Sequence, residues 1–531
     1  MHSGLIFRRK KLEKSIICSM LFIILLTCIG TVPLANGILW HITTVYSANS
    51  VNPGASIAVD SCCHVYISYG IKSGGQGHLA LSTRVGNAWS EELITSDPTY
   101  DVLDTSIALD SQGLPHICYL VGHSVYYAQK LFNGTWIFHL VDSDFPAGLY
   151  APSLALDSND KPHIIYISLE NGLKYAENTG GVWNIVTLDS TASYRGPSLA
   201  LDSSDHPHIS YSDARGLIYT WWDGSVWKEQ IFESGHLIFR TSIALDSGDK
   251  PHISYHVDDD DTLRHVMVVG GAWSIATVDS SGNVGWDNCI AVDSANNSHI
   301  SYRDFGTAHG LKYAVGQGMS WSIETVELGN FDQITSIALD SNEQPHITYV
   351  NADDQSLKHA GPLGLVTDLA VDMADPFQHV VSLGNYILIH VRLLNQGSEL
   401  ATFNATAFAN KTRADWDELS LEPGKSTLVN LTWPAKLFMK GNFSIEIAVD
   451  ILPCEVDVED NSMSAGWIFI TIQGDVNGDR TVDIFDIVNI AADYGLSYPD
   501  PKYDPNNDLD VDYDIDIFDI VAAASHYGES W

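Results

Sequence analysis

The sequence is poor in basic residues. It has 27 lysines and arginines against 66 aspartates and glutamates in 531 residues, and its formal net charge is −39 at pH 7. Nucleic acids and anionic membrane surfaces are bound by clustered lysine and arginine side chains, so neither partner is expected. Metal cations and neutral glycans are compatible with so acidic a chain.

Cysteine is also scarce, with seven residues in the chain. Two of them lie in the first 37 residues, and the other five show no spacing typical of a metal site or of a disulfide scaffold. The adjacent pair Cys62 and Cys63 leaves two alternatives. It either forms a strained bridge between neighbours or supplies two separately buried thiols, and we favour the second.

Long hydrophobic runs are confined to the N-terminus, where one extends from Ile16 to Val32 after five basic residues. The small residues AlaAsnGly at 35–37 suit a cleavage site, so we predict a signal peptide over residues 1–37 and an extracellular, secreted or cell-surface protein. If the segment is retained, its length approaches that of a membrane anchor. Six glycosylation sequons agree with export, namely Asn133, Asn296, Asn404, Asn410, Asn430 and Asn442.

One phrase occurs seven times, for example as SIALDSGDKPHISY from Ser242. Apolar and small or polar residues alternate in SIALD and in PHISY, which predicts two strands joined by a turn. A third run such as LKYA and a fourth that begins with Trp follow most copies. The aspartates of the phrase are 44 to 50 residues apart, the period of a four-stranded propeller blade: Asp60, Asp110, Asp157, Asp202, Asp246, Asp293 and Asp340.

The Trp-led strand indicates how the repeats close. It follows the first six copies but is missing after the seventh, where the chain runs into GPLG at 361–364. A matching segment, ILWHITTV from Ile38, precedes the first copy and carries Trp40 in the same register. We therefore predict that this segment completes the last blade of a seven-bladed β-propeller over residues 38–361, which removes open sheet edges.

Histidine and aspartate recur in every copy of the phrase, and this repetition argues against catalysis. A catalytic site needs distinct groups that occur once, whereas residues present in every blade satisfy turn amides or pack between sheets. Functional residues are therefore expected where the repeats differ.

The connections between consecutive blades carry an aromatic residue just before the first strand, on the usual ligand face of a propeller. Aromatic faces hold sugar rings, so these positions predict a glycan platform; the alternative is that they fill the seams between blades. The candidates are Tyr100, Tyr150, Tyr194, Phe239, Trp286 and Phe331. Hydrogen-bonding groups nearby are Arg195, Arg240, Asp287, Arg303 and Asp304.

The phrase resembles the repeats of extracellular propellers in the sialidase-like and lectin-like group. The SerXAspXGlyXThrTrp box and the arginine triad of sialidases are not found in this sequence, which argues against an enzyme. Paired carboxylates for glycoside hydrolysis remain an alternative, and the acidic run Asp258–Asp261 is the most conspicuous candidate, although a solvated loop is favoured.

Residues 362–472 have a different pattern. DLAVDM, YILIHVRLLNQG, ATFNATAFAN, STLVNLTW, FSIEIAVD and GWIFITI alternate with period two, which predicts a β-sandwich. The order VRLLNQGSELATF, LEPGKSTLVNLTW, GNFSIEIAVD and EVDVEDNS resembles the CARDB domain, an immunoglobulin-like module.

Residues 474–531 contain two twelve-residue patterns, which begin at Asp475 and Asp508. Oxygen ligands at positions 1, 3, 5, 7, 9 and 12, the seventh being a backbone carbonyl, match a calcium-binding loop. The first set is Asp475, Asn477, Asp479, Thr481, Asp483 and Asp486, and the second is Asp508, Asp510, Asp512, Asp514, Asp516 and Asp519. Because so many carboxylates repel one another, we expect this segment to become ordered only with Ca²⁺. Position 6, normally glycine, is Arg480 or Tyr513.

Two such loops, each followed by one helix, resemble a type I-like dockerin, a module that attaches extracellular proteins to a cohesin domain. In dockerins the residues at positions 10 and 11 contribute to partner choice, and here they are Ile484, Phe485, Ile517 and Phe518. These four side chains either contact a cohesin or pack between the two halves of the module.

The sequence thus predicts a mainly β protein: a seven-bladed propeller, an immunoglobulin-like sandwich and a small α-helical EF-hand-like dockerin that binds two Ca²⁺ ions. We expect the propeller to recognise a carbohydrate or surface ligand and the tail to dock on a scaffold. The alternatives are an exported polysaccharide-degrading hydrolase or lyase and a structural adhesion protein.

Overall fold

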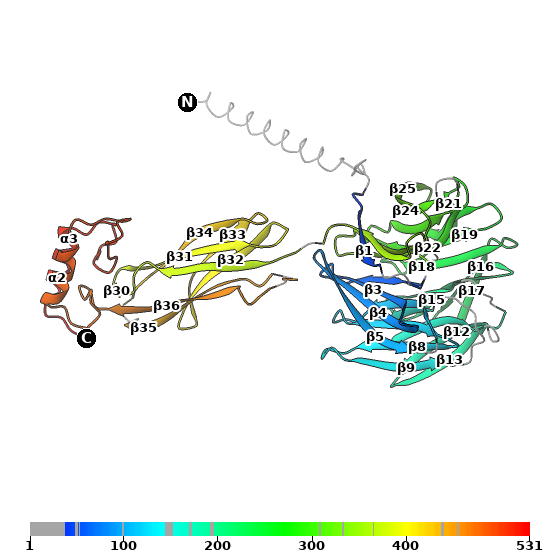
Figure 1. Cartoon of the computed structure of the whole chain (residues 1–531), viewed down its shortest axis with the longest axis horizontal. Helices are drawn as coiled ribbons and strands as arrows, with labels where there is room; N and C mark the ends of the chain where they lie inside the picture. Colours follow the sequence, from blue (N-terminus) through cyan, green and yellow to red (C-terminus); the bar gives the residue numbers. More distant parts are fainter. Residues whose placement is uncertain are drawn as a thin grey trace, which may run out of the picture.

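The computed structural model describes residues 38–531 apart from 48–50, 53, 98–99, 144–151, 169–171, 192–195, 307–308, 332–333, 365, 437–439, 453 and 456. Seven four-stranded sheets form one end of the molecule, two further sheets form its middle, and two helices lie at the far end (Figure 1). The segment expected to be a signal peptide lies outside the described residues. Within the described part, no helix has the length and hydropathy needed to cross a membrane.

Each of the seven sheets has the same antiparallel order. The inner strands are β2 (Ser56–Val59), β6 (Val102–Leu109), β10 (Ser153–Leu156), β14 (Ser198–Leu201), β18 (Ile238–Leu245), β22 (Val284–Val292) and β26 (Ser336–Leu339). The second strands are β3 (Val65–Ser73), β7 (Pro115–Val121), β11 (Pro162–Ser168), β15 (Pro207–Asp213), β19 (Pro251–Val257), β23 (Ser298–Asp304) and β27 (Pro345–Asn351).

The two outer positions of each sheet follow in the same order. The third strands are β4 (Gln76–Val85), β8 (Ser124–Lys130), β12 (Gly172–Thr179), β16 (Gly216–Trp222), β20 (Thr262–Val269), β24 (Gly310–Gln317) and β28 (Ser356–Gly361). The outermost are β5 (Ala88–Asp97), β9 (Trp136–Asp142), β13 (Val182–Asp189), β17 (Trp227–Phe232), β21 (Ala272–Asp279), β25 (Ser320–Leu328) and β1 (His41–Tyr46).

The N-terminal strand closes the ring, as the sequence predicts. Strand β1 pairs with β28, with His41 opposite Gly361. The Trp40 ring lies 5.3 Å from Tyr313, in the same edge-on arrangement as Trp273 and Tyr219 at 5.5 Å. The repeated sheets therefore have the closed arrangement of a seven-bladed propeller.

The inner strands are also joined around the ring. The backbone amide of Ile57 in the first blade donates to Ser336 Oγ of the seventh at 3.3 Å, and Ile243 makes the same contact with Ser198 at 3.1 Å. Every residue of β19 is buried, because both faces of this strand are covered by neighbouring blades. The outer strand β13 is mostly exposed, which explains why its hydrophobic pattern is weaker.

The middle of the molecule is a β-sandwich. One sheet has the order β29 (Leu369–Pro376), β31 (Tyr386–Asn395), β34 (Ser426–Pro434), and the other β30 (Val380–Ser382), β36 (Ser462–Thr471), β35 (Gly441–Val449), β32 (Ala401–Ala409), β33 (Thr412–Leu421). Buried apolar residues of both sheets form one core. All six predicted strands are present. Strands β30 and β33 were not predicted, since one has three residues and the other is largely polar and exposed.

The expectation for the cysteines was wrong. Cys62 of the propeller forms a disulfide with Cys454 of the sandwich, 392 residues away in the sequence, and Cys63 is a free, partly exposed thiol. Neither a bridge between the adjacent pair nor two separate thiols is present. A pairing between two domains leaves no local spacing pattern, so sequence reasoning could not find it. The bridge ties the propeller to the sandwich.

The C-terminal segment has two helices, α2 (Ile484–Ala492) and α3 (Ile517–Ser525). Each begins at an aspartate, Asp483 or Asp516, whose side chain accepts the amide of the second residue of the helix. A second aspartate three positions later completes a capping box in both helices. The same sequence feature therefore ends each acidic loop and starts each helix.

Candidate functional site

The recurring histidines and aspartates serve the blades, as predicted. Asp110 accepts the amides of Gln112 and Leu114 at 2.9 and 2.8 Å, which closes the turn between two strands. Its second oxygen lies 3.5 Å from His116 Nε2, and the other ring nitrogen of His116 lies 2.5 Å from the Tyr127 hydroxyl. Related contacts recur around the ring at His163, His208 and His299. These histidines are buried structural groups.

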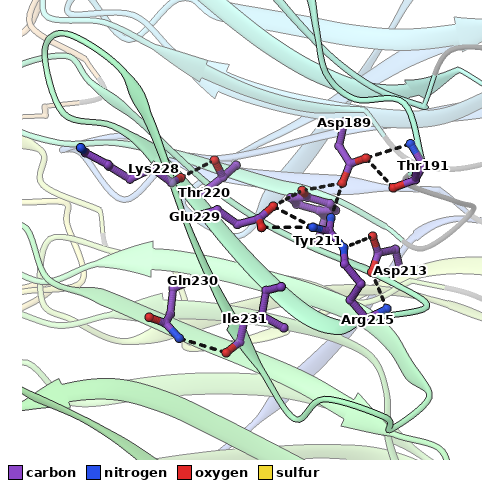
Figure 2. Close-up of polar contacts among 10 residues, drawn as sticks. All are labelled: Asp189, Thr191, Tyr211, Asp213, Arg215, Thr220, Lys228, Glu229, Gln230 and Ile231. Atoms are coloured by element: carbon purple, nitrogen blue, oxygen red, sulfur yellow. Dashed lines mark hydrogen bonds and ion pairs between the residues drawn. The ribbon is translucent and has the colours of Figure 1, made fainter.

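A second recurring group joins consecutive blades. An acid at the end of an outermost strand receives a tyrosine hydroxyl and, in most cases, a basic side chain from the next blade. Figure 2 shows one case, in which Tyr211 donates to Asp189 at 3.0 Å and Arg215 binds Asp189, Asp213 and Glu229. Corresponding pairs are Tyr166 with Asp142, Tyr302 with Asp279 and Tyr349 with Glu327. Because it recurs, this network is interpreted as structural.

The predicted glycan platform is only partly brought together. Tyr150, Tyr194 and Arg195 lie outside the described residues. The prediction for Phe331 was wrong. Its side chain is 6% exposed and its ring centre lies 5.3 Å from that of Tyr349, so it fills a seam between blades and is not accessible to a ligand. Tyr100 is exposed, and its ring centre lies 6.3 Å from that of His123 in the turn between β7 and β8.

Phe239 and Trp286 do come together, between the fifth and sixth blades. Their rings are 5.4 Å apart, and Trp286 also lies 4.4 Å from the His256 ring and 5.7 Å from Phe305. The guanidinium of Arg303 lies 4.1 Å from the centre of the Phe305 ring. We call these five side chains the aromatic cluster. Phe239 and Trp286 are partly exposed, and Phe305 is exposed.

Charged groups adjoin the aromatic cluster. Asp287, which follows Trp286, is buried and accepts from Arg303 at 2.6 Å and from Arg240 at 3.2 Å. The pKa of nearby Asp104 is raised. Burial is the largest cause, Arg240 acts in the opposite direction, and the charge of Asp287 adds to the increase. The ligand groups proposed from sequence, Arg240, Asp287 and Arg303, therefore meet at one place. Asp304 forms an ion pair with Lys312 at 2.9 Å, so it supports the fold.

The backbone at this place is unusual. Arg240 and Asp287 have φ values of 44° and 51°, in the left-handed region that non-glycine residues rarely adopt. The corresponding residue of the fourth blade is Gly196, with φ of 32°. Such conformations cost on the order of 1 kcal/mol or more and are concentrated at functional sites. The backbones of the fifth and sixth blades are therefore both strained at the place where Arg240 and Asp287 meet.

Sequence reasoning missed His256 and Phe305. A signal was present, because His256 and Arg303 each follow the tyrosine of the phrase, at a position where the other blades have small or apolar residues. His256 is fully buried, its Nδ1 lies 2.8 Å from the Val284 carbonyl, and burial lowers its pKa. The neutral His256 ring therefore packs against the Trp286 ring and holds it in position.

The acidic run Asp258–Asp261 does not supply a free pair of carboxylates. Asp259 accepts from the Leu237 amide at 2.9 Å and lies 3.1 Å from His236, and Asp260 pairs with Arg264. The run forms a turn between β19 and β20, as the non-catalytic alternative expected.

A separate cavity of about 310 Å³ lies between the third and fourth blades. It is lined by the aromatic residues Tyr175, Trp222 and Trp227 and by polar groups that include Glu177 and His206. Trp222 stands 5.7 Å from Trp227, edge to face. The cavity is formed by the outer strands of the two blades together with His163 and the turn residues Asp205 and His206 of the phrase, and the sequence analysis did not predict it.

The acidic loops have the geometry of a cation site. Asp475 and Asp486 of the first loop and Asp508 and Asp519 of the second are all fully buried. Carboxylate oxygens of Asp508, Asp510 and Asp519 lie within 4.8 Å of one another. Burial and three or more neighbouring carboxylates raise the pKa of Asp510 to about 6. An all-oxygen set of this charge fits a hard cation such as Ca²⁺.

The backbone on either side of the seventh position is hydrogen-bonded in the same way in both loops. The carbonyls of Arg480 and Val482 accept from the amides of Trp531 and Gly528 at 2.8 and 2.7 Å. Thr481 forms an antiparallel bridge with Ser530 in which the paired groups are those of Arg480 and Val482, so the Thr481 carbonyl faces away from residues 528–531. The carbonyls of Tyr513 and Ile515 accept from Tyr498 and Gly495, and Asp514 lies between them.

The missing glycines at position 6 leave the loop geometry intact. Arg480 and Tyr513 adopt φ values of 79° and 74°, the conformation that glycine normally provides. Their amides donate to the first ligand of each loop, Arg480 to Asp475 at 2.8 Å and Tyr513 to Asp508 at 2.9 Å. The strain is therefore offset by a charge-assisted hydrogen bond in both loops.

The four side chains at positions 10 and 11 are exposed. Ile484, Phe485, Ile517 and Phe518 are 52%, 64%, 49% and 65% exposed at the starts of α2 and α3. They do not pack between the two halves of the module, which was one of the two alternatives. Four apolar side chains held in solvent form a surface that a partner could cover.

No protein-family model and no curated protein matches the chain. Among solved structures, an Aleuria aurantia lectin in complex with alpha-methyl-L-fucoside is 13% identical over 54% of this chain and 97% of its own, with a TM-score of 0.37. An ulvan lyase, a polysaccharide lyase solved with bound -[GlcA(1-4)Rha3S]-, is 12% identical over 60% and 95%, with a TM-score of 0.43.

A further neighbour covers a fifth of the chain. A CARDB domain from Pyrococcus furiosus, in complex with di-metal ions, is 18% identical over 20% of this chain and 96% of its own, with a TM-score of 0.18. At these identities the similarity concerns the mainly β fold alone.

Proposed function

We propose that the protein is a secreted modular protein whose propeller recognises a carbohydrate through the aromatic cluster. The observation that carries the proposal is the arrangement around Trp286: partly exposed rings of Phe239, Trp286 and Phe305 beside the charged pair Arg303 and Asp287. Flat apolar faces contact the C–H groups of a sugar ring, and the buried ion pair of Arg303 with Asp287 holds the Phe305 ring in place.

Replacing Trp286 by alanine in the full-length chain is expected to weaken polysaccharide binding at least tenfold. An aromatic platform contributes about 1 to 3 kcal/mol of apolar contact, and tenfold corresponds to about 1.4 kcal/mol. Binding would be measured by pull-down on insoluble polysaccharides and by titration with soluble ones. Phe132→Ala, which removes a highly exposed ring on the turn between β8 and β9, is the matched control. Equal binding by both variants would contradict the proposal.

A second function, cleavage of the polysaccharide, is favoured by one observation, the raised pKa of Asp104 next to Arg240 and Asp287. A carboxyl whose pKa is raised is better suited to act as a general acid than one at its ordinary value. The carboxylates of Asp287 and Asp304 are instead held in ion pairs. Release of new reducing ends, abolished by Asp104→Asn, would establish the enzyme in place of the binding protein.

For the C-terminal segment we propose a dockerin-like module that binds two Ca²⁺ ions and attaches the protein to a cohesin-bearing scaffold outside the cell. The ligand sets are those predicted, and bound Ca²⁺ would neutralise the buried carboxylates. The sandwich, proposed as CARDB-like, lies between the two binding domains (Figure 1).

This docking role can be tested by substitutions in the exposed apolar surface of Ile484, Phe485, Ile517 and Phe518. Phe485→Asp together with Phe518→Asp is expected to abolish capture by cohesin domains, because two charges would be desolvated at the contact. Both side chains are mostly exposed to solvent and are not among the predicted ligands, so Ca²⁺ binding measured by calorimetry should not change. Tyr494→Asp, at an exposed ring beyond the end of α2, is the control. Capture that survives the double substitution would exclude this surface.

A further inference from the structure

The acidic loops do not form an isolated module. They are hydrogen-bonded to residues at one end of the sandwich. Phe377, which follows β29, packs among Tyr498, Tyr503 and Tyr513 with ring centres 5.8 to 6.1 Å apart. Phe377 thereby joins the small apolar core of the C-terminal segment, although it belongs to the sandwich.

The second loop is held by the sandwich at its first ligand. The buried Gln378 side chain donates to the Asp508 carbonyl at 3.3 Å and also to Pro505. The hydroxyl of Tyr503, one of the rings around Phe377, donates to the Asp508 carboxylate. The carbonyl of Asp508 is therefore positioned directly by Gln378. Its carboxylate is positioned by Tyr503, which packs against Phe377.

Backbone of the sandwich contributes as well. The amides of His379 and Val380 both donate to Asn506 Oδ1, at 3.1 and 2.9 Å, and the Asn385 side chain donates to the Leu509 carbonyl. Asn506 and Leu509 flank Asp508 in the sequence. The entry to the second loop is thus fixed by hydrogen bonds that end on the other domain.

The first loop is supported in the equivalent way. The buried Thr471 hydroxyl, at the end of β36, donates to the Asp475 carboxylate. Arg480, at position 6, places its guanidinium 5.9 Å from the Phe469 ring and 5.2 Å from Trp531. A Cβ added at Gly478 would lie 3.3 Å from Phe469, so loop and strand are in close contact.

From these contacts we infer that the sandwich is part of the cation site. Thr471 and Phe377 with Gln378 act as positioning residues for Asp475 and Asp508, the first ligands of the two loops. Affinity for Ca²⁺ is then a property of two domains together, and bound Ca²⁺ holds them as one body. The inference rests on the proposed Ca²⁺ binding, and linkage requires the coupling to be reciprocal.

The experiment uses the full-length chain, stripped with a chelator and titrated with Ca²⁺ by calorimetry. Loss of a group that orients a ligand typically lowers metal affinity about 10- to 100-fold. Thr471→Val is expected to weaken one of the two sites about tenfold, and Thr471→Ser, which keeps the donor, to restore it. Phe377→Ala should weaken the other site, whereas Trp416→Ala, at an exposed ring of the same sandwich, should change neither.

Hydrogen exchange gives the reciprocal measurement. The amides of His379 and Val380 end on Asn506, so Ca²⁺ should slow their exchange at least tenfold in the wild-type chain and not in Phe377→Ala. If the wild-type chain binds no Ca²⁺, the proposed function fails. If it binds two ions while Thr471→Val and Phe377→Ala keep full affinity, Ca²⁺ binding stands and the inference is overturned.

Discussion

Chelation of Ca²⁺ in the full-length chain is expected to unfold residues 474–531 while the propeller remains folded. Four fully buried carboxylates lie in this segment, at Asp475, Asp486, Asp508 and Asp519. A buried charge without a counter-ion costs several kcal/mol, and this segment has only seven buried apolar residues among the residues described. The helices α2 and α3 should then lose their protection from hydrogen exchange.

A pair of substitutions in the second loop separates ligand charge from net charge. Asp510 would bind through its side chain, whereas Asp514 would bind through its backbone carbonyl. Asp510→Ala should therefore lower the affinity of one site at least tenfold, while Asp514→Ala, with the same change in charge, should lower it by less than threefold. Calorimetric titration distinguishes the two. Equal losses would mean that the loop attracts cations only through its net charge.

Acid is expected to unfold the propeller well above the pH at which its carboxylates are protonated. Burial lowers the pKa of His265 to about 3 and that of His359 well below its usual value. A histidine whose folded-state pKa is depressed contributes full stability above its unfolded-state pKa and loses it as the pH falls. For His265 the loss begins near pH 6.5 and reaches about 3 kcal/mol at pH 4.

The substitution that tests this acid sensitivity is suggested by the other blades of the same chain. Where the fifth and seventh blades have His265 and His359, the fourth and sixth have Tyr219 and Tyr313, whose hydroxyls lie 2.6 Å from the phrase histidines. His265→Tyr with His359→Tyr should shift the midpoint of acid unfolding downward, by about 0.5 to 1 pH unit. Near-ultraviolet circular dichroism would follow the titration.

The control for this experiment is His236→Tyr, because the His236 side chain is 43% exposed, unlike the fully buried side chains of His265 and His359. It should leave the midpoint unchanged. A midpoint unaffected by the double substitution would show that the carboxylates, rather than the buried imidazoles, limit the acid stability of the propeller.

Much of the fold was contained in local sequence patterns. The strand period of two in SIALD and PHISY, repeated at the spacing of a blade, predicted seven sheets, and Trp40 predicted which strand closes the ring. The two acidic loops were predicted by spacing alone, since alternate residues of one short segment face the same way. These features depend on neighbours in the sequence, so no tertiary information was needed.

Tertiary structure decided the contacts between distant segments that carry no repeated pattern. The disulfide of Cys62 with Cys454, the contact of Phe377 with the second loop, and the meeting of His256 with Trp286 each link residues that share no periodic pattern. Phe331 and Phe239 both precede the phrase of a blade, but Phe331 pairs with Asn351 and Phe239 with His256, one position apart in the repeat, and only Phe239 is left partly exposed. Exposure depends on what the neighbouring blade places opposite each residue. A repeat sequence therefore determines the blades, and only their packing decides which of the repeated positions remain available to a ligand.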